Sequence, residues 1–378
     1  MVAFMGCLYA GVVAVPTALP GRKSRDWEKT AAIADDARVA VVLTVAEQHD
    51  VVSAKLFEHL RDKSLAILAT DDVREALADL WVPSDQRADA LAFLQYTSGS
   101  TGMPKGVMVT HGNLIHNQQM MRRAYLHDER TVYVSWLPLF HDMGLIGSVL
   151  QSLYVGGQCH LMTPVAFLQQ PLRWLQAISE LKATTSFAPN FAYELCLRRI
   201  TEEQRDRLDL SHWRLALNGA EPVRAETLER FAEYFAPCGF KWRSHFPAYG
   251  LAEGTLFVSG TGSEEEPYIV RVDKAALQNH RVVVSEAVEG TQCLVSSGRP
   301  TPIRKWPSLT RIIWVAARRM RSARSGSGEV VWRLATGVRR RSPVARSVHP
   351  FAAKKMGHTF EPETLASLRM GGCSSQDG

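Results

Sequence analysis

The feature that most constrains the fold is an alternation of short apolar runs with segments whose apolar residues recur at helical spacing. This rhythm is typical of an α/β protein in which helices cover parallel strands. We expect strands over Ala37–Thr44, Leu65–Thr70, Thr131–Pro138, Gln158–Thr163, Thr184–Ala188 and Trp213–Leu217, the first two buried, and helices over Gly144–Val155, Pro171–Lys182, Phe191–Ile200 and Arg224–Phe235.

Size and composition indicate a globular protein. The chain has 378 residues, of which 46% are hydrophobic and 22% charged, so wholesale disorder, collagen and coiled coil are excluded. Two or three domains are expected at this length. The net charge of +6 is unevenly spread, because residues 301–378 hold 15 basic and 4 acidic side chains. The preceding 300 residues are therefore mildly acidic.

The alternating rhythm ends near Pro302, and we expect a body over residues 1–302 and an Arg-rich tail over 303–378. One interpretation of the tail is a nucleic-acid-binding segment within Arg318–Arg346. Aromatic residues at regular spacing, which could stack on bases, are missing from it, so a nucleic-acid partner is disfavoured. The favoured interpretation is a non-native or disordered segment, since Arg enrichment with Asp depletion is typical of a G+C-rich gene read in the wrong frame.

The cysteines and apolar runs indicate the compartment. Six cysteines are scattered without a Cys-x-x-Cys pair, which is typical of reduced thiols. No stretch has the length and composition of a membrane span. The apolar N-terminal run lacks a preceding Lys or Arg and is interrupted by Gly6, Gly11 and Pro16, which disfavours a signal peptide. We therefore predict a cytoplasmic protein with no membrane span.

The most informative segment is Phe93–Thr110, which reads FLQYTSGSTGMPKGVMVT. Two β-prone runs flank a loop of glycines, hydroxyl side chains and one lysine. Glycine lets backbone amides approach a ligand closely, and amides with hydroxyls in a concave turn bind phosphate oxygens. The spacing is not that of a Walker A loop, and a solvated hairpin turn is the alternative. The candidate phosphate-binding residues are Thr97, Ser98, Gly99, Ser100, Thr101, Gly102 and Lys105.

The string TSGSTGMPKG resembles the signature loop of the adenylate-forming, or AMP-binding, superfamily. Further strings in the same order resemble its fatty acyl-AMP ligase branch: WLPLFHDMGLIG (Trp136–Gly147), FAPNFAYELC (Phe187–Cys196), NGAEPV (Asn218–Val223) and YGLAE (Tyr249–Glu253). The resemblance spans about residues 1–300. It implies an α/β fold, the large N-terminal domain of that superfamily, with stacked mixed sheets covered by helices.

The resemblance also implies roles. The loop residues would hold the ATP phosphates, and Phe187–Leu195 would line an acyl tunnel. His141, beside Asp142, would lie near the fatty acid carboxylate. The residues implied for adenine, ribose and Mg²⁺ are Gly219, Ala220 and Glu221 along the nucleoside, Tyr249 stacking on adenine with Gly250 beside it, and Glu253 as the carboxylate associated with Mg²⁺.

Each role has an ordinary alternative. His141 could be a hydrogen-bonded core histidine, and Glu253 a solvated carboxylate. Phe187, Phe191 and Tyr193 could be core aromatics. These alternatives stay open at the level of sequence.

The implied function is ATP-dependent activation of a long-chain fatty acid to an acyl-adenylate for lipid biosynthesis. The carboxylate nucleophile is ionised at neutral pH, so alignment and charge stabilisation are needed rather than a protein base. Glu253 and Gly298 lie 45 positions apart, longer than this stretch looks in acyl-CoA synthetases. We therefore expect transfer to an acyl carrier protein or polyketide synthase, with a fatty acid–CoA ligase and an inactive nucleotide-binding remnant as alternatives.

The sequence also departs from the family pattern. Residues 1–11 resemble an internal segment, and neither a Thr-Gly-Asp string nor the small C-terminal domain with its catalytic Lys is found after Pro302. We expect a chain truncated at both ends, partial at its nucleotide site, with little or no turnover.

Overall fold

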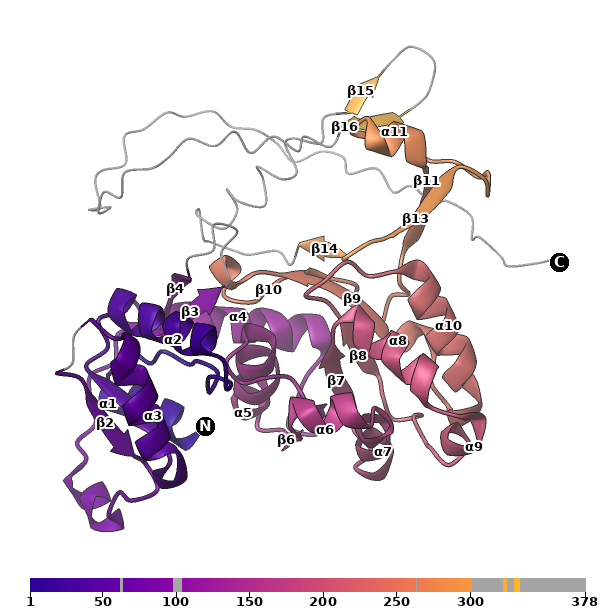
Figure 1. The fold of residues 1–378 in the computed structure, drawn as a ribbon. Helices are drawn as coiled ribbons and strands as arrows, with labels where there is room; N and C mark the ends of the chain where they lie inside the picture. The colour runs from indigo at the N-terminus through magenta and orange to yellow at the C-terminus, as the bar shows by residue number, and fades with distance from the viewer. Residues whose placement is uncertain (62–63, 98–103, 263, 301–321, 325–329, 334–378) are drawn as a thin grey trace. The chain divides into compact units, whose positions relative to one another are not determined.

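The computed structural model describes all residues except 62–63, 98–103, 263, 301–321, 325–329 and 334–378 (Figure 1). Its largest sheet has seven strands in the order β14-β10-β9-β8-β7-β5-β6. Strands β5 to β9 are mutually parallel, whereas β10 is antiparallel to both of its neighbours, β9 and β14. The strands are β5 (Val132–Ser135), β6 (Gln158–Leu161), β7 (Thr185–Ala188), β8 (Leu215–Asn218), β9 (His245–Gly250), β10 (Phe257–Gly260) and β14 (Arg299–Pro300).

Helices connect the parallel strands. Contacts place α8 beside α10, and α4 beside α5 and the π-helix η2. The helices around this sheet are α4 (His111–Tyr125), η2 (Met143–Leu150), α5 (Gln151–Val155), α6 (Pro164–Gln169), α7 (Leu172–Glu180), α8 (Asn190–Arg199), α9 (Glu202–Arg205) and α10 (Ala225–Phe235), with short 3₁₀ turns η3 (Ala236–Cys238), η4 (Trp242–Ser244) and η5 (Ala252–Gly254).

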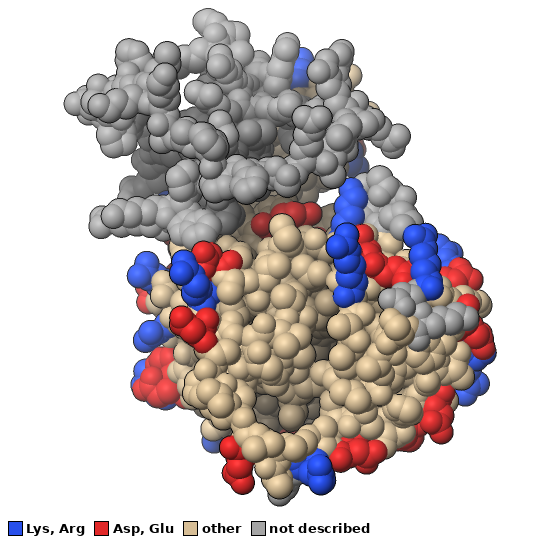
Figure 2. Space-filling view, turned by 90° about the vertical axis from the view of Figure 1, so that its left-hand side faces the viewer, with Lys and Arg blue, Asp and Glu red and all other residues tan. Residues whose placement is uncertain are grey.

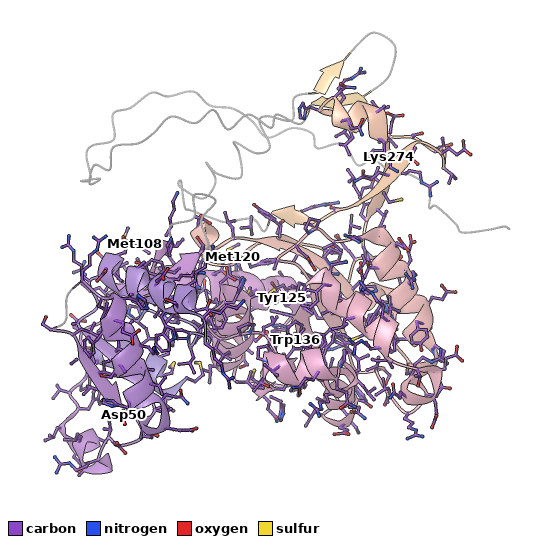
Figure 3. All side chains as sticks on the ribbon, viewed as in Figure 1. Asp50, Met108, Met120, Tyr125, Trp136 and Lys274 are labelled. Carbon is purple, nitrogen blue, oxygen red and sulfur yellow. The ribbon has the colours of Figure 1, made fainter. Side chains whose placement is uncertain are left out.

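Burial explains why these segments adopt their structures. In α10, Leu228, Phe231 and Phe235 recur at helical spacing and are fully buried. Burying each such side chain contributes roughly 1.5–3 kcal/mol. Strands β7 and β8 are buried along their whole length, as expected for central parallel strands. The interior includes Tyr125 of α4 and Trp136 after β5, which Figure 3 shows among the other side chains. The α/β prediction is confirmed.

Residues 1–97 add a smaller layer. Strands β1 (Val41–Thr44) and β2 (Ala66–Ala69) form a parallel two-stranded sheet. The helices α2 (Ser24–Asp36) and α3 (Ala46–His59) bury an apolar cluster against it that includes Trp27 and Leu56. The other elements here are α1 (Val2–Ala10), the 3₁₀ helix η1 (Glu75–Leu80) and β3 (Leu91–Thr97), which pairs with β4 (Lys105–Thr110).

The prediction that the first two strands are buried is wrong. Val41, Leu43 and Leu68 are each at least 40% exposed, because helices cover only one face of this two-stranded sheet. Figure 2 views the side on which α1, α3 and β2 are labelled in Figure 1, and the centre of that side carries few charged side chains.

The remaining described elements lie beyond β10. Strands β11 (Ile269–Asp273) and β13 (Thr291–Val295) are antiparallel, and α11 (Lys274–Gln278) follows β11. Strand β12 (Arg281–Val282) pairs with β16 (Val330–Arg333), which also pairs with β15 (Ser322–Arg324). Apart from these two strands the predicted tail lies outside the described residues, so the boundary at residue 302 stays a prediction. No helix in the described part is long and apolar enough to cross a membrane.

Candidate functional site

The predicted site segments follow the carboxyl ends of parallel strands. His141 comes after β5, Gly219 comes directly after β8, and Tyr249 precedes the last residue of β9. Because the strand order reverses at β5, with β6 on one side and β7 on the other, this edge contains a topological switch point. Ligands of open α/β sheets bind at such points. The sheet therefore brings three of the predicted segments to one edge.

The β3–β4 hairpin carries the candidate phosphate loop. Thr97 and Lys105 are paired in the last register position, and the Lys105 side chain is exposed. Ser98, Gly99, Ser100, Thr101 and Gly102 lie outside the described residues. The hairpin that the sequence predicts is therefore present around a loop whose own geometry is not described.

Tyr96 ties this hairpin to α2. Its hydroxyl donates to Asp36 Oδ2 at 2.5 Å, and burial together with this bond raises the pKa of Tyr96. Gly106 is paired with Tyr96 across the hairpin, and a Cβ atom at Gly106 would lie 2.9 Å from Tyr96 Cζ. The glycine after Lys105 thus makes room for the tyrosine ring.

The segment after β8 approaches β9 closely. A Cβ atom at Gly219 would lie 3.2 Å from the Ala248 carbonyl oxygen, so a larger residue would crowd β9, the strand that carries Tyr249. Ala220 has φ +66°, a left-handed conformation that costs energy for a residue with a Cβ. Glu221 accepts a hydrogen bond from the Phe191 backbone N–H at 2.6 Å, at the start of α8. Its carboxylate therefore fixes this segment against α8.

Tyr249 and Gly250 are the last two residues of β9, and Glu253 lies shortly after them on η5. The Tyr249 side chain is 53% exposed, so a ring face is accessible to a planar ligand. Gly250 and Glu253 are also exposed, the latter on η5. Because Gly219 packs on the residue preceding Tyr249, the two predicted nucleoside-binding segments are neighbours.

His141 pairs with Asp142 at the surface rather than lying in the core. Its Nδ1 lies 2.7 Å from Asp142 Oδ1, and its side chain is 54% exposed, so the core-histidine alternative is wrong. Asp142 is largely buried, and the same oxygen accepts from the Met143 N–H at 2.7 Å. The hydrogen bond to Asp142 raises the pKa of His141 above its ordinary value. The pair therefore presents a histidine that holds its proton to higher pH.

The aromatic residues of the predicted tunnel wall divide into two groups. Phe187 and Tyr193 are fully buried in the main core, as the alternative proposed. Phe191 is 41% exposed and meets Trp136 edge to face, with ring centroids 6.0 Å apart. Trp136 in turn stacks on Phe167 at 4.0 Å. Of the three aromatics, Phe191 alone remains a candidate for contact with an acyl chain.

Sequence reasoning missed Asn190, a buried residue whose side chain makes several hydrogen bonds behind the segment that follows β8. Its Nδ2 donates to Glu194 and Thr227, and its Oδ1 accepts from Asn218 Nδ2 and from the Arg224 backbone N–H. Asn190 thus joins both ends of the segment between β8 and α10. The only available signal was a polar residue at the start of an apolar helix, which is too common to identify such a role.

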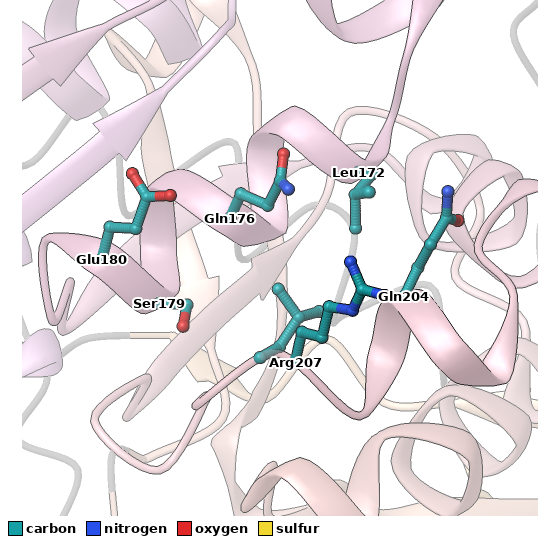
Figure 4. Close-up of a pocket in the computed structure, with 7 residues that line it drawn as sticks. Leu172, Gln176, Ser179, Glu180, Gln204 and Arg207 are labelled. Carbon is teal, nitrogen blue, oxygen red and sulfur yellow. The ribbon is translucent and has the colours of Figure 1, made fainter.

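A separate pocket of about 340 Å³ lies at α7 and α9 (Figure 4). It is lined by Leu172, Gln176, Ser179, Glu180, Gln204, Arg207 and Leu208. None of the predicted site residues contributes to it, so it is not the candidate site.

A magnesium site fits this arrangement only in cooperation with a substrate. Among the described residues, no three His, Cys, Asp or Glu side chains converge as a metal-binding group. Mg²⁺ is usually held by one or two carboxylates together with substrate phosphates. The exposed carboxylate of Glu253 is compatible with that mode.

The sequence matches the AMP-binding enzyme family over residues 1–293. The chain belongs to this family. The prediction from the loop and its companion strings is thus confirmed, and the α/β body has the fold of the N-terminal domain of adenylate-forming enzymes.

Similar proteins include ligases of fatty acids. The medium-chain-fatty-acid–[acyl-carrier-protein] ligase JamA of Moorena producens is 44% identical, over 79% of this chain and 51% of its own length. The long-chain-fatty-acid–AMP ligase FadD32 of Mycolicibacterium smegmatis is 38% identical, over 81% and 49%. A crystal structure of the fatty acyl-adenylate ligase from L. pneumophila, with acyl adenylate and pyrophosphate, matches with a TM-score of 0.74 and 41% identity, covering 80% of this chain and 52% of that one. The chain spans about half the length of these relatives.

Proposed function

We propose that this chain carries the ATP and fatty acid sites of a fatty acyl-AMP ligase. The reaction joins a carboxylate oxygen of the fatty acid to the α-phosphorus of ATP, and the bond from that phosphorus to pyrophosphate breaks. The observation that carries the proposal is the convergence of the segments after β5, β8 and β9 at one sheet edge. Two relatives whose names specify fatty acid ligation support the substrate class.

The residues divide the work by their chemistry. Lys105 supplies a positive charge for the ATP phosphates, together with the loop Thr97–Gly102. Gly219, Ala220 and Glu221 line the nucleoside, and the exposed ring of Tyr249, followed by Gly250, stacks on adenine.

The acid substrate meets a different pair. His141, whose pKa is raised by its contact with Asp142, orients the fatty acid carboxylate. Glu253 would hold Mg²⁺, which when bound would neutralise phosphate charge. No protein nucleophile is required, because the substrate carboxylate is already ionised. Catalysis then rests on alignment.

We further propose that the acyl group goes to an acyl carrier protein or a polyketide synthase in lipid biosynthesis, in the cytoplasm. The similarity to JamA, a ligase named for its acyl-carrier-protein acceptor, supports this acceptor. The long stretch between Glu253 and Gly298 supports it over coenzyme A. Incubating the purified chain and preformed acyl-adenylate with each acceptor separates the two, because consumption of the adenylate by coenzyme A would identify a fatty acid–CoA ligase.

The phosphate-loop assignment is tested by Lys105→Ala. Removing a charged contact to phosphate costs about 1.5–3 kcal/mol, so ATP affinity measured by calorimetry should fall roughly tenfold to a hundredfold. Lys274→Ala is the matched control, because Lys274 is also exposed but lies on α11 (Figure 3). Equal ATP affinity in the wild type and the Lys105 variant would show that Lys105 does not contact phosphate.

Turnover is tested separately, by fatty-acid-dependent exchange between ATP and pyrophosphate. We predict little or no exchange by the 378-residue chain alone. ATP binding without exchange would identify a nucleotide-binding chain that is catalytically impaired. Robust exchange would refute that prediction and leave the proposed reaction intact.

A further inference from the structure

Helix α4 carries two adjacent buried amides, Asn117 and Gln118, each 3% exposed. The helix follows directly on β4, which begins at Lys105. Its first turn is fixed by a capping box, in which Thr110 and Asn113 exchange side-chain and backbone hydrogen bonds of 3.1 Å. The amides are therefore rigidly connected to the strand that carries Lys105.

Asn117 holds the turn that follows Glu253. Its Nδ2 donates to the Phe257 carbonyl at 2.9 Å and to the Gly254 carbonyl at 3.3 Å, and its Oδ1 accepts from the Phe257 N–H at 3.1 Å. One side chain thus contacts both ends of the Gly254–Phe257 turn. Within that turn Thr255 has φ +74°, a conformation that persists only where the surroundings impose it.

Gln118 anchors the same helix on the His141 side. Its Nε2 donates to the Ile146 carbonyl of η2 at 3.2 Å, and η2 begins directly after Asp142. On β3, Gln95 donates to the Phe140 carbonyl at 2.8 Å, next to His141. The unit β3–β4–α4 is therefore hydrogen-bonded through buried side chains to the segments that carry both His141 and Glu253.

We propose that Asn117 is a positioning residue, which sets the place of Glu253 relative to Lys105. This inference rests on the proposed function. An apolar side chain of similar size could fill the space, whereas a buried amide costs free energy unless it is hydrogen-bonded. Asn117 uses its whole amide on the turn behind Glu253. Because this reaction depends on the alignment of charged groups, a small displacement of one of them should greatly reduce its rate.

The test measures how much Mg²⁺ strengthens ATP binding, by calorimetry with the full chain in the presence of Mg²⁺ or of EDTA. We expect Asn117→Ala to reduce this enhancement about tenfold, the usual effect of losing a group that orients a metal-binding side chain. Glu253→Gln should reduce it similarly. Because Asn117 acts through Glu253, the double variant should lose no more than Glu253→Gln alone. ATP affinity in EDTA should change less than about twofold in Asn117→Ala, because the other phosphate contacts remain.

Met120→Ala is the control for general destabilisation. Met120 lies on the same helix (Figure 3) and is 6% exposed, so its truncation loosens the core without removing a hydrogen bond to the turn. Its melting temperature should fall while the Mg²⁺ enhancement is kept. If Asn117→Ala does not fold, Asn117→Leu fills the space with an apolar side chain of similar size and removes the hydrogen bonds to the turn, and the same loss of enhancement is expected.

Three outcomes overturn the inference. Full Mg²⁺ enhancement in folded Asn117 variants would show that the amide does not position Glu253. Additive losses in the double variant would show that the two residues act independently. If wild-type chain binds no ATP, the proposed function fails, and the positioning role fails with it. Wild-type binding with unaffected variants refutes the positioning role alone.

Discussion

Among the described residues of the site, Gly250 is the position where the backbone leaves least room. A Cβ atom there would lie 2.2 Å from the Leu256 carbonyl oxygen, although such contacts are essentially never shorter than 3.0 Å. The neighbour is main chain, not the end of a flexible side chain. Replacing Gly250 with alanine therefore forces β9 and the segment leading to β10 apart.

The cost follows from these contacts. Overpacking of this kind costs about 1–3 kcal/mol. The Leu256 carbonyl also accepts from the Leu251 N–H at 3.0 Å, and loss of that bond would add about 1 kcal/mol. Because Glu253 lies between Leu251 and Leu256, the displacement should also reduce ATP affinity in the presence of Mg²⁺.

The assay is thermal or urea unfolding of Gly250→Ala, with ATP binding measured on the folded variant. Gly6→Ala is the matched control, because Gly6 lies inside α1 and a Cβ there meets nothing within 4 Å. Alanine should stabilise that helix by about 0.5–1 kcal/mol. Equal stability of wild type and Gly250→Ala would refute the packing at this turn.

Two predictions concern pH. Asp142→Asn removes the carboxylate that raises the pKa of His141, so His141 should lose its proton at lower pH in the variant than in the wild type. Fatty acid affinity should then decline at correspondingly lower pH. An unchanged titration of His141, followed by NMR, would contradict this prediction. His127 and His245 are buried, which lowers the pKa of each from 6.5 to about 3. Since the unfolded chain binds these protons first, stability should be retained above pH 6.5 and decline toward pH 3, by at most about 1.4 kcal/mol per pH unit for each histidine. A urea midpoint that is equal at pH 7 and pH 4.5 would contradict this second prediction.

Local patterns were enough to locate most of the large sheet. The expected strand over Thr184–Ala188 is β7, and the expected helix over Arg224–Phe235 is α10. The helix is marked by apolar residues at helical spacing, whereas the strand is buried at every position and was located by its place between two helical segments. The expected helix over Gly144–Val155 exists, but its first part is the π-helix η2. The spacing of apolar residues does not distinguish a π-helix from an α-helix at this length.

Helix α4 was not expected from the sequence. Its polar positions Asn117 and Gln118 face the interior, so its apolar pattern is weak. The capping pair Thr110 and Asn113 was the available signal for its start. Similarly, the strands β1 and β2 were expected to be buried because their composition is apolar, yet their packing leaves one face exposed. Composition cannot report how many faces of a sheet are covered.

In the candidate site, too, sequence motifs identify some residues, whereas others can be identified only from the fold. Lys105, His141, Tyr249 and Glu253 are all exposed, and they were identified because their neighbours in sequence are distinctive. Their supports are buried amides from distant parts of the chain: Asn190 joins the segment after β8, and Asn117 reaches 140 positions to Phe257. Such bonds depend on the completed fold, because a buried amide is tolerated only where its partners have already been brought to it. Side chains that contact a ligand can therefore be predicted from sequence motifs, whereas the buried side chains that position them can be identified only in the structure.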